Sequence, residues 1–247
     1  MRVLLTRPQA QTDELGAVLE KQDIEWLGEP LLRIVPVSWN PDVLAGRQAL
    51  LLTSANAARE LLRVHGVRRD MPIYAVGPDT AAPLLAEGFS NVRAAGGTAV
   101  GLIGYIRRHA DPRAGPLLYL SGLDVTLDLA AALAAAGWAA DRVVVYRAFA
   151  AEQLSIEARR ELSQNRLDAA VFLSARTAAI FCSLIIASGI VDACSRMTAV
   201  AISAKVAEAL RPAGFGQVVV SGTPDIDSIV DAVLRVAAGA PEVQKEG

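Results

Sequence analysis

The sequence has few of the residues that form metal sites, disulfide frameworks or histidine-dependent catalytic centres. Its 247 residues include two cysteines, Cys182 and Cys194, whose separation does not match a paired zinc-ligand motif, so both are expected to be reduced. The two histidines, His65 and His109, lie far apart in polar sequence, which favours solvated side chains over a metal ligand or a general base. No metal ion is therefore expected, and Ser–His or Cys–His catalysis has little support.

An excess of positive charge and long hydrophobic runs are also missing. Lys and Arg number 24 against 26 Asp and Glu, whereas a protein that holds a nucleic-acid backbone needs a cationic face. The apolar stretch near the amino terminus, residues 3–5, is too short for a signal peptide. The most apolar later run, residues 178–191, is shorter than a membrane span and is expected to form a buried helix. We expect a cytoplasmic protein that binds neither nucleic acid nor a membrane.

Common nucleotide and hydrolase motifs are missing as well. The chain has no Gly-x-Gly-x-x-Gly turn, no phosphate loop that ends in Gly-Lys-Ser/Thr, and no Gly-x-Ser-x-Gly elbow. Because these motifs are missing, the sequence gives no support to a nucleotide cofactor or to serine hydrolysis.

Aliphatic residues dominate what is present, and their spacing indicates an α/β protein. Short β-branched or aliphatic runs alternate with helical periodicity, which is typical of parallel sheets covered by helices. The runs expected as strands are residues 3–5, 31–35, 49–52, 73–76, 117–120, 143–145, 169–172, 199–202 and 218–220. The last helix is expected to begin with Thr223 as N-cap and Pro224 at its first position. Gly88, Gly137 and Gly214 are expected to end helices in the left-handed conformation.

The chain also resembles itself. Residues 52–58 align with residues 172–178, and residues 75–77 align with residues 201–203, in the same order along the chain. We therefore expect two similar α/β lobes, with a ligand site between them.

Small, hydroxyl and glycine residues occupy the corners where the expected strands lead into helices. Such corners lie at the carboxyl edge of a parallel sheet, where ligands bind, and helix N-termini there attract carboxylate or phosphate. The corners are residues 6–8, 53–56, 77–80, 96–98, 121–122, 174–177, 203–205 and 221–223. Helix capping alone would explain any single corner. Their repetition indicates a ligand with several anionic groups, and Arg7, Arg176 and Lys205 are candidate partners for its carboxylates.

Tyr146 closes an apolar run, Val143-Val144-Val145, close to the expected crossing between the lobes. A buried tyrosine often only packs and finds one hydrogen-bond partner, so the residues alone leave its role open.

Taken together, several short motifs resemble those of the uroporphyrinogen-III synthase family, in order and over almost the whole chain. They are Leu4-Leu5-Thr6-Arg7-Pro8, residues 52–57, residues 74–81 with Gly88-Phe89, Val145-Tyr146-Arg147, residues 172–178 and Gly214-Phe215. The resemblance implies two flavodoxin-like lobes formed by an interleaved chain. Residues 1–36 with 150–247 would form one lobe and residues 39–147 the other, with connecting strands at 33–38 and 144–150.

The resemblance also implies a reaction, the cyclisation of hydroxymethylbilane to uroporphyrinogen III in tetrapyrrole biosynthesis. Water is lost and the last pyrrole ring is inverted through a spiro intermediate, without a cofactor. The linear tetrapyrrole substrate carries eight carboxylates, which suits the anion-binding corners. Tyr146 falls on the family's tyrosine and would form a hydrogen bond to the departing hydroxyl group. Leu173 and Val206 depart from the family pattern, so no threonine role passes to Val206.

The corners and the resemblance, taken together, give the expected substrate-binding residues, which are Arg7, Thr53, Ser54, Asn56, Thr80, Ser121, Ser174, Arg176, Ser203 and Lys205. Among them Thr80, Ser54 and Ser174 fall on hydroxyl residues of the family's cleft. A monomer is expected, with transient contact to hydroxymethylbilane synthase. The alternatives are a non-enzymatic two-lobed protein that binds a small anion, and an inactive homologue.

Overall fold

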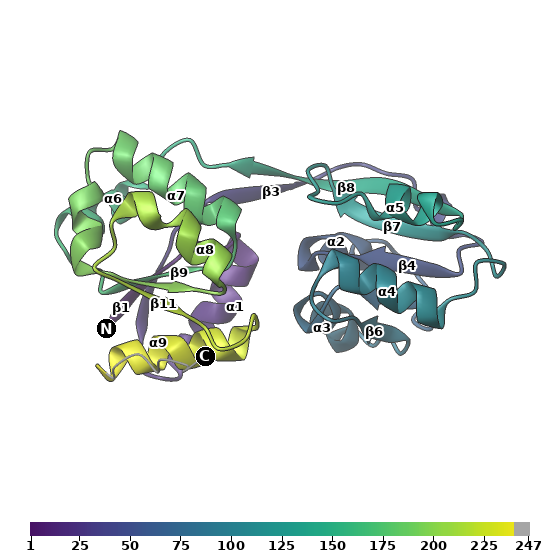
Figure 1. The fold of residues 1–247 in the computed structure, drawn as a ribbon, viewed down its shortest axis with the longest axis horizontal. Coiled ribbons are helices and arrows are strands. Elements are labelled where there is room, and N and C mark those ends of the chain that lie inside the picture. The colour runs from purple at the N-terminus through teal and green to yellow at the C-terminus, as the bar shows by residue number, and fades with distance from the viewer. Residues whose placement is uncertain (240–247) are drawn as a thin grey trace. The chain divides into compact units, whose positions relative to one another are not determined.

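The computed structural model describes residues 1–239, which form two compact units, each built on a sheet with helices on both faces (Figure 1). Unit 1 comprises Met1–Arg33 and the chain from Phe149 onward, and unit 2 comprises Ile34–Ala148. The chain passes between the units twice, in β3 (Leu32–Pro36) and in β8 (Ala140–Ala150), which are neighbours in the sheet order. The expected α/β class with two units and an interleaved chain is confirmed.

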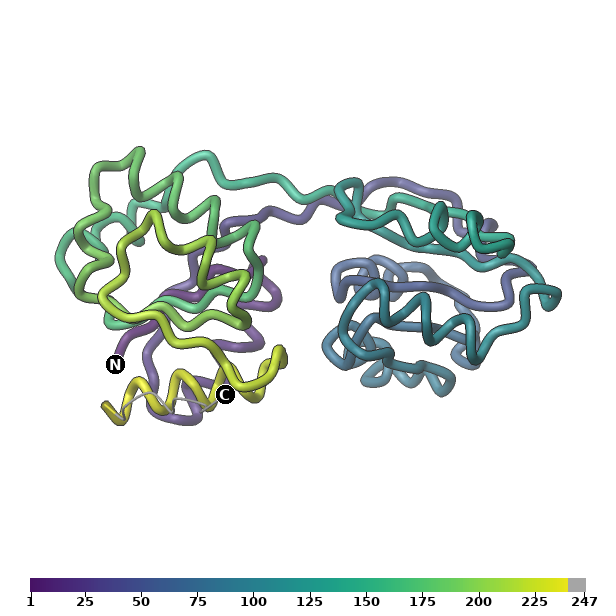
Figure 2. Tube along the Cα trace, viewed as in Figure 1, coloured from purple at the N-terminus to yellow at the C-terminus, as the bar shows by residue number. Residues whose placement is uncertain are grey.

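Unit 1 contains a parallel sheet in the order β11-β10-β9-β1-β2. Its strands are β1 (Arg2–Leu5), β2 (Glu25–Gly28), β9 (Ala169–Phe172), β10 (Thr198–Ala201) and β11 (Gln217–Val220). Its helices are α1 (Gln9–Glu20), α6 (Ile156–Ser163), α7 (Ala175–Ala187), α8 (Ala204–Ala209) and α9 (Ile226–Ala237), with 3₁₀ turns η2 (Val191–Arg196) and η3 (Arg211–Ala213). The amino-terminal segment, purple in Figure 2, lies beside the green carboxy-terminal half, because β1 pairs with β9.

Unit 2 contains a sheet in the order β3-β8-β7-β4-β5-β6. The five neighbouring strands β8-β7-β4-β5-β6 are parallel to one another. The strands not yet introduced are β4 (Ala49–Leu52), β5 (Ile73–Ala75), β6 (Val92–Ala94) and β7 (Leu117–Gly122). The helices are α2 (Ala55–Leu62), α3 (Pro78–Ala86), α4 (Ala99–His109) and α5 (Leu129–Ala135), with a 3₁₀ turn η1 (Pro41–Leu44).

The sheet of unit 1 and the strands β4 to β8 of unit 2 have the same spatial arrangement. The chain begins that arrangement at a different strand in each unit. Numbered along the chain, the strands of unit 1 lie in the flavodoxin-like order 2-1-3-4-5. In unit 2 the strands β4 to β8 lie in the order 3-2-1-4-5, so that β8-β7-β4-β5-β6 corresponds to β2-β1-β9-β10-β11. The internal repeat of the sequence is thereby confirmed, because β4 matches β9 and β5 matches β10.

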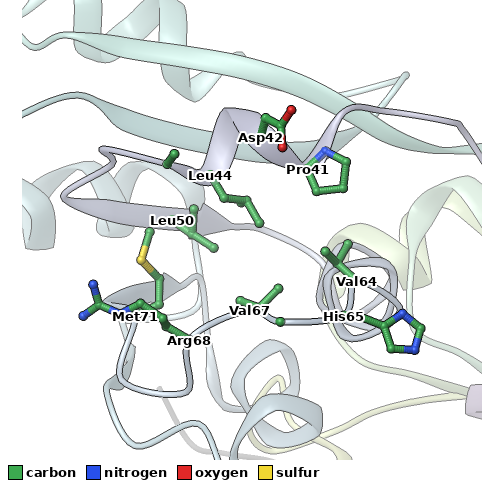
Figure 3. A pocket seen from close by; sticks show the side chains of 11 residues that line it. Pro41, Asp42, Leu44, Leu50, Val64, His65, Val67, Arg68 and Met71 are labelled. Atoms are coloured by element: carbon green, nitrogen blue, oxygen red, sulfur yellow. The ribbon is translucent and has the colours of Figure 1, made fainter.

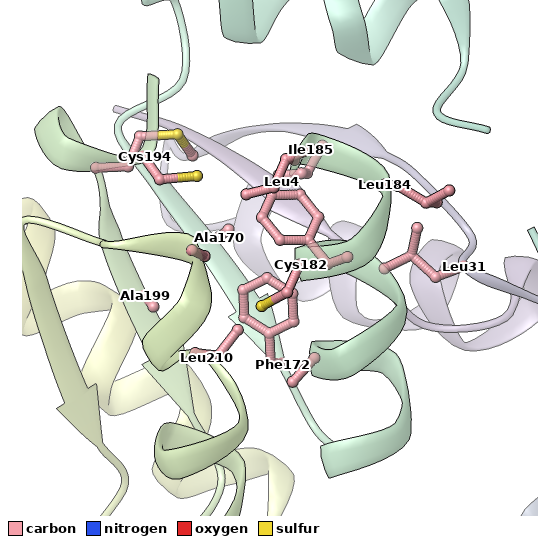
Figure 4. Close-up of a cluster of buried hydrophobic side chains, with 14 of the residues drawn as sticks. Leu4, Leu31, Ala170, Phe172, Cys182, Leu184, Ile185, Cys194, Ala199 and Leu210 are labelled. Atoms are coloured by element: carbon pink, nitrogen blue, oxygen red, sulfur yellow. The ribbon is translucent and has the colours of Figure 1, made fainter. Parts of the chain in front are cut away.

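Alternating strand residues supply a separate apolar cluster on each face of a sheet. In β1, Val3 and Leu5 join the cluster under α1 and α9, whereas Leu4 joins the cluster under α7. Figure 4 shows this second cluster, in which Cys182 and Cys194 lie among aliphatic side chains and Phe172. Both thiols are free, and burial raises the pKa of Cys194 to about 12.

The structure differs from the sequence-based expectation at three kinds of position. Edge strands β2 and β6 were not expected, because each is short and only one residue in each, Leu27 and Val92, is buried. Helix α9 begins at Ile226, not after Thr223, because the Asp225 side chain accepts the backbone N–H of Ser228 at 2.8 Å and caps the helix instead. The expected buried helix over 178–191 ends at Ala187.

The glycines expected to end helices do adopt the left-handed conformation. The backbone angle φ is +82° at Gly88, +85° at Gly137 and +63° at Gly214.

Candidate functional site

The candidate residues of unit 2 gather at the carboxyl edge of its sheet. Strands β4 and β7 are adjacent, and the connections from them lead to opposite sides, so the edge between them is the switch point at which doubly wound sheets bind ligands. Thr53 and Ser54 follow β4, and Ser121 and Gly122 end β7. Tyr146 is paired with Gly122 on the neighbouring strand β8. The sequence-predicted residues on these three strands therefore share one edge.

A β-bulge sets the direction of the Tyr146 side chain. Ser121 pairs with Val144, but Gly122 pairs with Tyr146, so β8 contains one extra residue at this point. Strict alternation would place Val145 and Tyr146 on opposite faces, yet both pack against the cluster under α2 and α3. Bulges redirect side chains in this way, often beside active sites, and they are rare in parallel sheets.

Gly122 provides the space in which the Tyr146 ring lies. A Cβ atom at Gly122 would stand 2.7 Å from Tyr146 Cζ, 2.8 Å from Cε2 and 2.9 Å from the hydroxyl oxygen. These distances are too short for any side chain, so glycine is required for this ring position. The backbone N–H of Leu123 donates to the Tyr146 carbonyl at 2.9 Å, which ties the two strand ends together.

Arg142 of β8 holds the same corner from the other side. Its Nε donates to Ser121 Oγ at 2.8 Å, and one terminal nitrogen donates to the carbonyls of Gly122 and Leu123 at 2.9 and 2.8 Å. The other terminal nitrogen forms an ion pair of 3.0 Å with Asp128 Oδ2. Asp128 is in turn the N-cap of α5, and its side chain accepts the N–H groups of Ala130 and Ala131.

The Asp128 carboxyl is stabilised in its charged form. Burial alone would raise its pKa, but the backbone N–H of Ala131 and the Arg142 guanidinium together hold the pKa below its usual range. A second polar pair lies nearby, where Thr53 Oγ1 and the Tyr119 hydroxyl are 2.9 Å apart. Burial raises the pKa of Tyr119, so this phenol stays protonated at neutral pH.

The other candidate residues of unit 2 lie in the first turns of helices at this edge. Ser54 is the N-cap of α2 and accepts the backbone N–H of Asn56 at 3.1 Å. A serine oxygen that accepts one such bond keeps a proton that it can donate. Thr80 is buried in the first turn of α3, whose N-cap, Gly77, supplies no side chain. The positive end of the α3 dipole therefore lies at the edge without a side-chain cap.

Unit 1 has the corresponding edge, with the switch point between β1 and β9. Arg7 follows β1, and its Nε donates to Gln11 Oε1 at 3.2 Å. Ser174 follows β9 and caps α7, and Arg176 is exposed in the first turn of that helix. Ser203 is the N-cap of α8 with Lys205 exposed in its first turn. The five candidate residues of this unit thus follow three adjacent strands.

One predicted residue is placed differently from expectation, and three residues of the site were missed. Ser121 lies within β7 and not at a helix start, is 1 % exposed, and donates its hydroxyl to the Gly122 carbonyl at 3.0 Å. Its environment differs because β7 extends two residues beyond the expected strand. The sequence places Gly122 at a corner but does not predict its contact with Tyr146. Arg142 and Tyr119 carry no motif, because their contacts depend on the strand pairing.

A pocket of about 320 Å³ in unit 2 lies away from these residues (Figure 3). Leu44 and Asp42 come from the turn that precedes β4, and Val67 and Arg68 from the loop between α2 and β5. These segments lie at the amino edge of the sheet, and no predicted site residue lines the pocket. Over residues 1–239, no group of three His, Cys, Asp or Glu side chains could hold a metal ion. No helix in that range is long and apolar enough to cross a membrane.

Solved structures with the same fold include proteins of two bacteria. A mutant uroporphyrinogen III synthase of Thermus thermophilus is 20% identical, with a TM-score of 0.53 over 97% of this chain and 99% of that chain. The uroporphyrinogen-III synthetase of Helicobacter pylori is 18% identical, with a TM-score of 0.60 over 96% of this chain and 100% of that chain. At these identities the likeness shows the fold alone. A comparison with curated protein sequences gave no match.

The family comparison covers most of the sequence. Residues 13–231 match the HEM4 family model, described as uroporphyrinogen-III synthase HemD. The matched segment includes the candidate residues of both edges except Arg7, which follows β1 and precedes the match, and it includes Tyr146. The chain therefore belongs to the uroporphyrinogen-III synthase family.

Proposed function

We propose that this chain is a cyclising lyase that converts hydroxymethylbilane to uroporphyrinogen III. The family match supports the activity, and one structural observation supports the position of the chemistry. A bulge and a glycine direct Tyr146 to the carboxyl edge beside the switch point of unit 2. Such a feature is expected where one side chain must be placed accurately.

Tyr146 acts on the leaving group. Its phenol donates a hydrogen bond to the hydroxyl group and passes its proton to that oxygen as the carbon–oxygen bond breaks, so that the group departs as water. The nitrogen electron pair of the pyrrole that carried the hydroxymethyl group forms an azafulvenium cation, and the substituted carbon of the last ring attacks this cation to give a spiro intermediate. The bond from that carbon to the methylene of the third ring then breaks, and the free α-carbon of the last ring attacks this methylene, which inverts the ring. The proton released when the ring regains aromaticity returns to the phenolate.

Binding must also prevent direct closure to the uninverted isomer. We assign this role to donors that hold the substrate's carboxylates and fix the last ring before water is lost. Arg7, Arg176 and Lys205 supply charge-assisted contacts, and Ser54, Thr80 and Ser174 lie at helix starts where dipoles favour anions. Thr53, Asn56 and Ser203 complete the set, whereas Ser121 contributes by accepting a hydrogen bond from Arg142.

The reaction products distinguish this proposal from the alternatives. Freshly generated hydroxymethylbilane is supplied to purified protein, the products are oxidised, and type I and type III porphyrins are resolved by chromatography. Protein-dependent type III product supports the synthase. Tight binding of hydroxymethylbilane by the folded protein, with type I as the only product, would instead identify a two-lobed binding protein or an inactive homologue.

We further propose that the protein acts as a cytoplasmic monomer that receives its substrate during transient contact with hydroxymethylbilane synthase. The support is chemical, because hydroxymethylbilane closes spontaneously and a short transfer time limits that loss. Sedimentation of the protein alone and with hydroxymethylbilane synthase tests the monomer and the contact, and a stable dimer of this chain would contradict the monomer. The transfer is tested by measuring the type III yield of the coupled reaction as the concentration of hydroxymethylbilane synthase is varied. A yield that does not depend on that concentration would contradict the transfer.

A further inference from the structure

We infer that Arg142 is a positioning residue for Tyr146, acting through the backbone of Gly122 and Leu123. This inference rests on the proposed function, because it explains how the phenol is held for the leaving group. It concerns a residue of β8 that carries no motif in the sequence and that no feature of the resemblance includes.

The hydrogen bonds of Arg142 are directed entirely into the protein. A guanidinium has five N–H donors, and four of them are used, toward Ser121 Oγ, Asp128 Oδ2 and the carbonyls of Gly122 and Leu123. The side chain is 22% exposed. An arginine engaged in this way has little left to offer a substrate carboxylate, so its contribution is to hold the corner rather than to bind.

The corner that Arg142 holds is the one that supports the Tyr146 ring. The Gly122 carbonyl accepts from Arg142, while the Cα of the same residue lies against the ring. Leu123 is held from both directions, because its carbonyl accepts from Arg142 and its N–H donates to the Tyr146 carbonyl. Movement of this short backbone segment would therefore move the surface on which the ring rests.

Loss of the guanidinium would release that segment. Two backbone carbonyls would lose donors, and the Asp128 carboxylate would lose its partner while still capping α5. Lysine at position 142 could pair with Asp128. It lacks the planar fork of donors of a guanidinium, so it could not also reach two carbonyls and a serine. Both Arg142→Met and Arg142→Lys are therefore expected to loosen the Tyr146 ring.

Arg47 provides a matched control in the same unit. Its Nε donates to the Val43 carbonyl at 2.8 Å, and it forms an ion pair with Asp141, with the side chain 15% exposed. Arg47 precedes β4 and Asp141 lies near the start of β8, so this pair is at the amino edge of the sheet. Arg47→Met removes a comparable arginine without disturbing the Gly122 corner.

The first measurement needs no turnover. The four tyrosines are labelled with 3-fluorotyrosine in the full chain, and Tyr146→Phe assigns the Tyr146 fluorine resonance. Arg142→Met and Arg142→Lys should shift or broaden that resonance, and Arg47→Met should leave it unchanged. An unchanged Tyr146 resonance in a folded Arg142 variant would overturn the inference even if the protein is an active synthase.

The second measurement asks whether the catalytic effect passes through Tyr146. In the otherwise unaltered protein, Arg142→Met should lower kcat for type III formation about tenfold with KM within about twofold. In the Tyr146→Phe background the same change should lower kcat less than about twofold, because groups that act as a unit are not additive. Equal losses in both backgrounds would overturn the inference. Absence of type III product from the unaltered protein would overturn the proposed function, whatever the fluorine spectra show.

Discussion

The ring of Tyr146 rests on the Cα of Gly122 so closely that a Cβ atom there would lie 2.7 Å from its Cζ. The two residues are paired across β7 and β8 at a bulge, and the backbone after Gly122 is bonded to the Tyr146 carbonyl. Position 122 therefore fixes where the phenol lies, although its own residue has no side chain.

Gly122→Ala should displace the Tyr146 ring and slow turnover. The added methyl group meets the ring at 2.7–2.9 Å, so we expect a stability loss of about 1–3 kcal/mol and a fall in kcat of about tenfold. Gly104→Ala in α4 is the control, because a Cβ there has Arg108 at 3.5 Å as its nearest neighbour. The free energy of unfolding of that variant should rise by up to about 1 kcal/mol, and it should keep full activity. Normal turnover by Gly122→Ala would show that the ring position is not needed.

Tyr146→Phe should lower kcat while leaving KM almost unchanged. The ring remains and fills the same space, but the hydrogen bond to the departing hydroxyl is lost, which predicts about a tenfold fall in kcat. Steady-state kinetics of type III formation measure both constants. If turnover stays at the unaltered rate, Tyr146 only packs against its neighbours.

The sheets and their binding edges could be predicted because buried parallel strands are short aliphatic runs followed by capping residues. Residues 49–52 and 169–172 are strands β4 and β9 as expected, and Ser54 and Ser174 cap the helices that follow. The internal repeat located corresponding strands in the two units, since similar local sequences adopt similar turns.

The environment of Tyr146 could not be predicted, because it depends on which residues pair across β7 and β8. A register shift at Ser121 and Gly122 has no local sequence signal, and alternation alone would place Tyr146 on the opposite face from Val145. The role of Arg142 could not be predicted either, because the acceptors of its hydrogen bonds become its neighbours only after folding. Thr223 was expected to cap α9 for a different reason, since Asp225 two residues later is also a good N-cap and is the one used.

Lys205→Gln should raise KM for hydroxymethylbilane by about three- to tenfold with little change in kcat. Lys205 is exposed, and its charge is proposed to bind a substrate carboxylate. Added salt should weaken substrate binding by the unaltered protein more than by the variant. Lys21→Gln is the control, because Lys21 is exposed at the end of α1 and away from the carboxyl edge. Identical KM values for the two variants would remove Lys205 from the binding set.

The acid stability of unit 1 should depend on Glu161. Its carboxylate accepts from Arg166 at 2.8 and 2.5 Å, Arg160 at 3.1 Å and Arg2 at 2.6 Å. The Arg166 hydrogen bonds, with help from Arg160 and Arg2, lower the pKa of Glu161 to about 2. Because the pKa of an unfolded glutamate is about 4.3, this stabilisation is complete above about pH 5 and is lost as the pH falls toward 2.

Glu161→Gln should therefore be less stable than the unaltered protein at pH 7, and the difference should shrink between pH 5 and pH 3. Urea denaturation midpoints at pH 7, 4 and 3 measure the change. Glu157→Gln is the control, since Glu157 is 55% exposed and stands 3.9 Å from Arg2. A difference between Glu161→Gln and the unaltered protein that stays constant with pH would contradict the assigned pKa.

The most direct test of the proposed function is the fraction of type III porphyrin formed at fixed hydroxymethylbilane as the protein concentration is raised. Spontaneous closure gives type I in the absence of protein. The proposed function predicts that type III rises with protein until it accounts for nearly all of the product. Type I alone at every concentration of folded protein would contradict it.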